Sequence, residues 1–72
     1  MTTFHPSTIK RTDGWHKAMV IMRNPAGQCI GSRTTAHCFA TAREAREYAR
    51  DAAVRTVRRL ARDFPRFNAQ VA

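Results

Sequence analysis

The side chains best suited to metal binding or nucleophilic attack are few in this sequence: His5, His16, His37, Cys29 and Cys38. Zinc sites usually take their ligands from pairs spaced C-x-x-C or H-x-x-x-H, and none of these residues has that spacing. His37 and Cys38 are adjacent, so on a strand they would point to opposite faces, and no nucleophile motif surrounds them. We therefore expect no metal, no cofactor and no catalytic site.

The five acidic residues and three glycines form neither an acid–base catalytic pattern nor a phosphate-binding motif. Glu44, Glu47 and Asp51 fall among arginines in a helical pattern, which is typical of a solvated helix face. The glycines stand at separate turns and make no phosphate-binding loop. A chain of 72 residues also has little room for a pocket that excludes water. These features favour a binding protein over an enzyme.

Basic residues dominate the charge, because thirteen Lys and Arg oppose five Asp and Glu for a net charge of +8. Eleven of the thirteen are arginine, whose planar guanidinium pairs with phosphate or carboxylate through two hydrogen bonds. Excess basic charge is a feature of nucleic-acid-binding proteins, although a GC-rich genome would also enrich arginine and alanine. The candidate binding residues are Lys17, Arg23, Arg33, Arg43, Arg46, Arg50, Arg55, Arg58 and Arg62.

The first half of the chain predicts a small antiparallel sheet. Residues 1–6 show no periodicity and are interpreted as a loose arm, and residues 7–39 as two or three strands. Asp13-Gly14 and Asn24-Pro25-Ala26-Gly27 are hairpin turn signals, and a bulge is expected near Gly31-Ser32. Apolar residues lie on both faces of the strand from Trp15 to Arg23, with Trp15 expected to pack in the core.

The second half predicts one long helix over residues 42–63. Thr41 and Glu44 form a capping box at its start, and Pro65 ends it. An apolar stripe recurs at steps of three and four, and Phe64 and Phe67 are expected to close its far end. The stripe consists of Ala42, Ala45, Ala49, Ala53, Val57, Leu60 and Phe64. Because it lacks a sustained Leu/Ile heptad, we expect the helix to dock on the sheet rather than pair with a copy of itself.

The predicted fold is therefore a single α+β domain, a two- or three-stranded antiparallel meander packed on a C-terminal helix, with residues 65–72 as a tail. A monomer and a homodimer are both compatible with this pattern. No stretch approaches the ~18–20 apolar residues needed to span a bilayer. The N-terminus lacks the apolar region of a secretory signal, so we expect a cytoplasmic protein without a membrane partner.

The junction of Phe39, Thr41, Glu44 and Ala45 resembles the strand-to-helix junction of small arm-type and AP2-like DNA-binding domains of phage integrases. In that family the sheet lies in the DNA major groove and the helix packs behind it. The same segment resembles the last strand and helix of a double-stranded-RNA-binding domain. That second resemblance implies that Arg43 and Arg46, at the helix start, would contact phosphates. The chain lacks the leading helix and the lysine pair of the RNA-binding family.

Two functions follow from these observations. In the first, the domain binds nucleic acid through phosphate contacts from Lys17, Arg23 and Arg33 on the sheet and Arg43 and Arg46 on the helix. In that arrangement Arg55 and Arg58 would matter less. In the second, the chain is a phage- or plasmid-type inhibitor or adaptor, anti-CRISPR proteins being one example, and docks an acidic patch on a protein partner.

Overall fold

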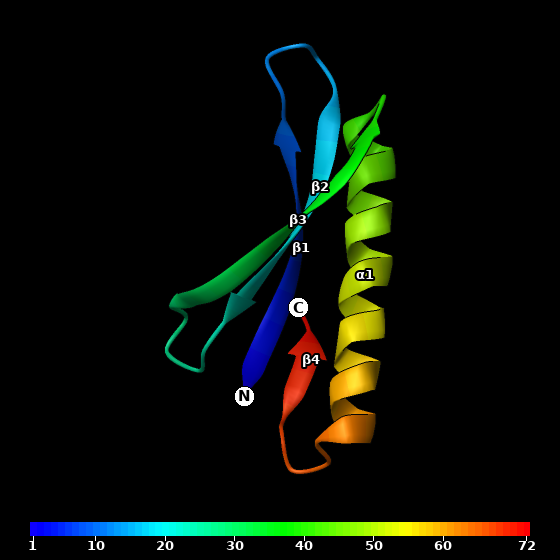
Figure 1. Cartoon of the computed structure of the whole chain (residues 1–72). Helices are drawn as coiled ribbons and strands as arrows, with labels where there is room; N and C mark the ends of the chain where they lie inside the picture. Colours follow the sequence, from blue (N-terminus) through cyan, green and yellow to red (C-terminus); the bar gives the residue numbers. More distant parts are fainter.

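The computed structural model describes residues 1–72 and shows a four-stranded mixed sheet with one helix packed on one face (Figure 1). The elements in chain order are β1 (Thr2–Lys10), β2 (His16–Arg23), β3 (Cys29–Phe39), α1 (Ala42–Asp63) and β4 (Ala69–Val71). The order across the sheet is β3-β2-β1-β4. The three long strands are antiparallel neighbours, and β4 runs parallel to β1. The α+β class is confirmed. The prediction of two or three strands, all antiparallel, is wrong because β4 adds a fourth strand that runs parallel to β1.

Both predicted turns connect antiparallel strands. The turn between β1 and β2 contains Gly14 at a φ of 89°, and the turn between β2 and β3 contains Gly27 at a φ of 85°. Glycine adopts such positive φ values without a steric cost from Cβ. In the second turn the side-chain oxygen of Asn24 accepts a 2.9 Å hydrogen bond from the Gln28 amide, which fixes the start of β3.

The ends of the chain differ from the predicted arm and tail, because both are strands. Phe4 is buried beneath α1, and this burial holds residues 2–10 in the sheet as β1. Pro6 lies beyond the three residues of β1 that pair with β4, so its missing N–H costs no hydrogen bond to that strand. At the other end, the Thr2 amide donates to the Asn68 carbonyl and the Ala72 amide donates to the Phe4 carbonyl. These two bonds flank the short parallel pairing of β4 with β1.

The helix α1 covers the range that its sequence pattern predicts. The Thr41 hydroxyl oxygen accepts a 3.2 Å hydrogen bond from the Glu44 amide, and the same hydroxyl donates to the Glu44 carboxylate at 3.1 Å. Ala45, Ala49 and Ala53 have no exposed surface, so the helix backbone approaches the sheet closely. Burial of only small side chains explains why the helix is tight against β1 and β2. The helix is not both long and apolar enough to cross a membrane.

Three aromatic residues expected in or beside the core are exposed instead. Trp15 is 46% exposed, Phe64 is 60% exposed and Phe67 is 42% exposed. Trp15 lies in the turn beyond the last β1–β2 pair, so no strand covers it. Phe64 follows the last residue of α1, and the chain turns there toward β4 rather than continuing the apolar stripe.

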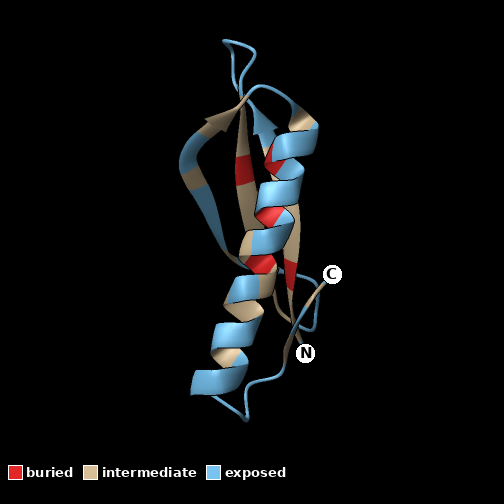
Figure 2. Cartoon of the chain, turned by 90° about the vertical axis from the view of Figure 1, so that its right-hand side faces the viewer, coloured by how far each residue is buried: buried red, intermediate tan, exposed pale blue.

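The strand β3 bows away from α1 (Figure 2). Its register shifts between the pairs Thr34↔Met19 and Cys38↔Lys17, so the three residues 35–37 face Ala18 alone. At this bulge the Thr35 hydroxyl donates hydrogen bonds to the carbonyls of His37 and Ala18, at 3.2 and 3.4 Å. Extra residues in one strand bend it and increase its twist. A second shift lies just before Gly31, while Gly31 and Ser32 themselves keep regular pairing. This bulge therefore lies one residue before the position that the sequence predicts.

Candidate binding groove

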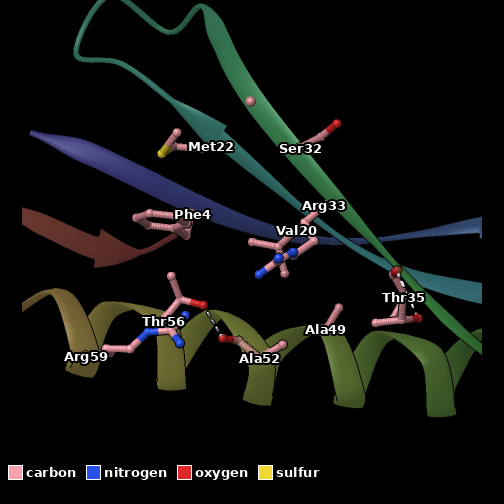
Figure 3. Close-up of a pocket in the computed structure, with 12 residues that line it drawn as sticks. Phe4, Val20, Met22, Ser32, Arg33, Thr35, Ala49, Ala52, Thr56 and Arg59 are labelled. Atoms are coloured by element: carbon pink, nitrogen blue, oxygen red, sulfur yellow. Dashed lines mark hydrogen bonds between the residues drawn. The ribbon is translucent and has the colours of Figure 1, made fainter.

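A cavity of about 310 Å³ lies where β3 diverges from α1. Half of its twelve lining residues are hydrophobic, and they come from the buried face of the sheet and the facing side of the helix. Figure 3 shows Phe4 and Val20 on the strands facing Ala52 and Thr56 on the helix. The lining residues are Phe4, Ala18, Val20, Met22, Gly31, Ser32, Arg33, Thr35, Ala49, Ala52, Thr56 and Arg59.

The cavity continues along α1 as an open hollow whose wall is basic. The two share Arg33, Thr35, Ala52, Thr56 and Arg59, and the hollow adds Tyr48, Arg55, Arg58 and Arg62. We call the cavity and the hollow together the α1–β3 groove. Its five cations, the groove arginines, are Arg33, Arg55, Arg58, Arg59 and Arg62. No acidic residue lines either part, so the groove combines an apolar floor with a positively charged wall.

The groove arginines have few anionic partners within the chain. Arg62 pairs with Asp63 at 3.0 Å, and both side chains are exposed to solvent, which screens this pair. The Arg55 guanidinium lies 5.7 Å from the centre of the Tyr48 ring. Arg33, Arg58 and Arg59 make no ion pair with a carboxylate. Positive charges gathered with few internal counter-charges favour binding of an external anion.

An aromatic ladder extends from the groove toward the C-terminal end of β3. The ring centres of Tyr48 and Phe39 are 5.2 Å apart, and those of Phe39 and His37 are 5.6 Å apart. Tyr48 joins the ladder to the groove because it lines the basic hollow, and 38% of it remains exposed. Aromatic faces beside a basic groove are the combination found where proteins bind unpaired bases.

The structure brings together only part of the predicted binding set. Arg33, Arg55, Arg58 and Arg62 line the groove, while Lys17 and Arg23 lie on the opposite face of the sheet. That separation follows from the register, because Arg33 pairs with Val20 on the helix-covered face and strand side chains alternate. Arg59 lines both parts of the groove but was missing from the predicted set, although its place on the helical wheel, on a flank beside Arg55 and Arg62, could have indicated it.

The predicted cations on the other side of α1 remain outside the groove. Arg43 pairs with Glu47 at 3.3 Å near the helix start. Arg46 and Arg50 are exposed and line no part of the groove. The sequence-based grouping of Arg43 and Arg46 with Arg33 therefore does not match a single surface.

The residues considered for metal binding or nucleophilic chemistry are dispersed over the molecule. Cys38 accepts a 3.0 Å hydrogen bond from the Arg11 guanidinium, and Asp13 lies 3.1 Å from the same side chain. The hydrogen bond to Cys38 and the charge of Asp13 raise the pKa of Arg11 above its ordinary value. Cys29 is exposed in β3, and the side chains of His5 and Thr3 are joined by a 2.8 Å hydrogen bond. None of these residues lines the groove.

Comparison with protein-family models, with curated proteins and with solved structures finds no match to this chain. The resemblance to integrase arm-type and RNA-binding domains therefore stays a prediction, and the candidate site rests on the geometry of the groove alone.

Proposed function

We propose that this chain is a non-catalytic nucleic-acid-binding protein of the cytoplasm, and that the groove arginines hold the phosphates. The observation that supports this proposal is the gathering of five arginines along one groove that no carboxylate lines. Each guanidinium offers a planar set of donors that matches a phosphate group. The spacing of Arg55, Arg58, Arg59 and Arg62 over two helical turns gives an extended basic row, which suits a repeating phosphate chain better than a single anion.

Phosphate contacts predict a steep dependence of affinity on salt. Each phosphate neutralised releases counterions and adds about 0.9 to the logarithmic salt slope for a duplex, or about 0.7 for a single strand. Four or five contacts from the groove arginines would therefore give a slope of roughly −3 to −4.5. This proposal reverses the roles expected from the sequence, where Arg43 and Arg46 were the phosphate contacts and Arg55 and Arg58 were the weaker ones.

The test compares two double variants with equal loss of charge from the same helix. Arg55→Gln/Arg59→Gln removes two groove arginines, and Arg46→Gln/Arg50→Gln removes two arginines outside the groove. Affinity for labelled oligonucleotides is measured by fluorescence anisotropy between about 50 and 200 mM salt. We expect the groove variant to flatten the salt slope by about 1.4–1.8 units and the control to change it far less. Equal effects of the two variants, or no binding by the native chain near 150 mM salt, would contradict the proposal.

A second candidate function is docking to an acidic protein surface, as an inhibitor or adaptor of the phage or plasmid type. The observation that favours it is the position of β3 at the edge of the sheet, beside the groove, with no strand on its outer side. Such an edge can accept an added strand from a partner, with specificity given by nearby side-chain sites. This candidate gains support if a partner is retained after nuclease treatment and is lost in the Arg55→Gln/Arg59→Gln variant.

A further inference from the structure

We infer that the nucleic acid held by the α1–β3 groove is single-stranded and that one unpaired base enters the cavity between the helix and β3. This inference rests on the proposed function and specifies its ligand. It draws on three features that phosphate binding alone does not use: the apolar floor, the hydroxyl groups beside it, and the aromatic ladder that begins at Tyr48.

The floor of the cavity suits the flat, largely apolar face of a base. Phe4, Val20 and Met22 line it from the sheet, and Ala52 lines it from the helix. Its volume of about 310 Å³ lies at the small end of ligand pockets, which begin near 300 Å³. A sugar-phosphate chain without bases has no flat apolar group of the size needed to fill this space. The cavity would then stay wet while the groove arginines were occupied.

The hydroxyl groups of Thr35 and Thr56 give the cavity wall hydrogen-bond acceptors. The Thr56 hydroxyl donates a 2.8 Å hydrogen bond to the Ala52 carbonyl, and the Thr35 hydroxyl is directed at the carbonyls of His37 and Ala18. Both hydroxyl protons are therefore engaged within the protein, and the oxygen lone pairs remain available as acceptors. Such acceptors suit the ring and exocyclic N–H groups that a base exposes once it is unpaired.

The bases of a duplex cannot contact the cavity floor, the threonine hydroxyls or the aromatic ladder. In a duplex the phosphates lie outside and the bases are stacked and paired, so only base edges are accessible from the grooves. An unpaired strand exposes base faces that stack on aromatic side chains, and Tyr48 lies beside the basic hollow with Phe39 and His37 continuing from it. A strand held by the groove arginines thus passes from the cavity to the exposed ring of Tyr48 without leaving the groove.

The test separates bases from phosphates. Affinity is measured at one salt concentration for a single-stranded oligothymidylate, for an abasic strand with the same number of phosphates, and for a duplex of that length. Stacking of a base contributes a factor of about five to 150, so the oligothymidylate should bind at least about fivefold tighter than the abasic strand, and tighter than the duplex. Its salt slope should match that of the abasic strand, since the phosphate number is unchanged.

The outcomes distinguish this inference from the proposed function. Equal binding of the abasic strand and oligothymidylate, or tighter binding of the duplex, would overturn the inference and leave phosphate binding intact. Absence of binding to all three would overturn both. Tighter binding of oligothymidylate supports both.

A cavity-filling variant tests where the base lies. Ala52→Leu places a larger apolar side chain in the cavity without changing charge, and Ala61→Leu makes the same change on the exposed part of the helix. We expect Ala52→Leu to reduce oligothymidylate affinity toward that of the abasic strand and to leave abasic binding unchanged, while Ala61→Leu changes neither. If Ala52→Leu does not fold by circular dichroism, the smaller cavity-filling change Ala52→Val takes its place, with a loss of affinity again expected for oligothymidylate only. An unchanged preference for oligothymidylate in the folded variant would exclude the base from this site.

Discussion

Arg33 and Lys17 show how the position of a single residue along a strand decides its part in binding. Both are basic residues on neighbouring strands, and the sequence suggests one common surface for them. Arg33 pairs with Val20 on the face that α1 covers, whereas Lys17 pairs with Ile9 and Cys38 on the other face. Because side chains alternate along a strand, the two cations point away from each other across the sheet. Only Arg33 meets the helix arginines.

The first prediction follows from this placement. Arg33→Gln should reduce the salt slope of oligonucleotide binding by about 0.7–0.9 units, because one phosphate contact is lost. Lys17→Gln removes the same charge from the opposite face and should leave the slope nearly unchanged. Anisotropy titrations over a salt series measure both. A larger effect for Lys17→Gln would place the binding surface on the uncovered face of the sheet.

At the scale of elements, the close approach of α1 to the sheet depends on small side chains. Ala45, Ala49 and Ala53 are fully buried at steps of four, and Ala18 of β2 is fully buried beneath the helix. Small residues on both elements leave no space for a longer side chain, since protein interiors are close-packed. The same tight contact with β1 and β2 fixes the helix while β3 bends away, and this leaves the groove on one side.

Overpacking this contact should therefore destabilise the fold. We expect Ala45→Leu to lower the free energy of unfolding by about 1–3 kcal/mol, because the added atoms force side chains or the helix backbone to shift. Ala61→Leu, at an exposed position of the same helix, should change stability by less than about 0.5 kcal/mol. Urea unfolding followed by circular dichroism compares the two. Equal stability of both variants would show that the contact between the helix and the sheet accommodates a larger side chain.

The whole molecule is elongated and has a very small core. It measures 42 × 23 × 16 Å, and its five buried residues are Phe4 and four alanines. A core of this size rarely supplies more than about 3–5 kcal/mol of stability. Mutual repulsion among the arginines lowers it further, since a net charge far from zero destabilises a compact state. Neutralising the groove arginines by an anionic ligand should therefore have a large relative effect on folding.

Ligand-linked stability provides the corresponding prediction. An oligonucleotide at one hundred times its dissociation constant should raise the free energy of unfolding by about 2.7 kcal/mol. Thermal unfolding of the native chain with and without oligonucleotide measures this shift. The Arg55→Gln/Arg59→Gln variant should show a much smaller shift at the same oligonucleotide concentration, and Arg46→Gln/Arg50→Gln should resemble the native chain. A shift that does not differ between these variants would indicate diffuse charge attraction rather than binding in the groove.

The local elements of this protein follow from its sequence alone. Thr41, Glu44 and Pro65 set the ends of α1 through capping and through the loss of a helical hydrogen bond, both of which act within a few residues. Gly14 and Gly27 similarly set the two hairpin turns. The spacing of Ala45, Ala49 and Ala53 at steps of four also predicts which face of the helix is buried.

The tertiary structure decided the features that depend on distant partners. The three residues of β4 carry no periodic signal, and they form a strand because β1 offers a free edge beside them. The bulge opposite Ala18 bends β3 away from α1, and only that divergence brings Arg33 beside Arg59 around a shared cavity. The cavity depends on where β3 separates from α1, and the spacing of residues within one element does not predict that separation. The arginines were therefore visible in the sequence, but the groove that unites five of them was not.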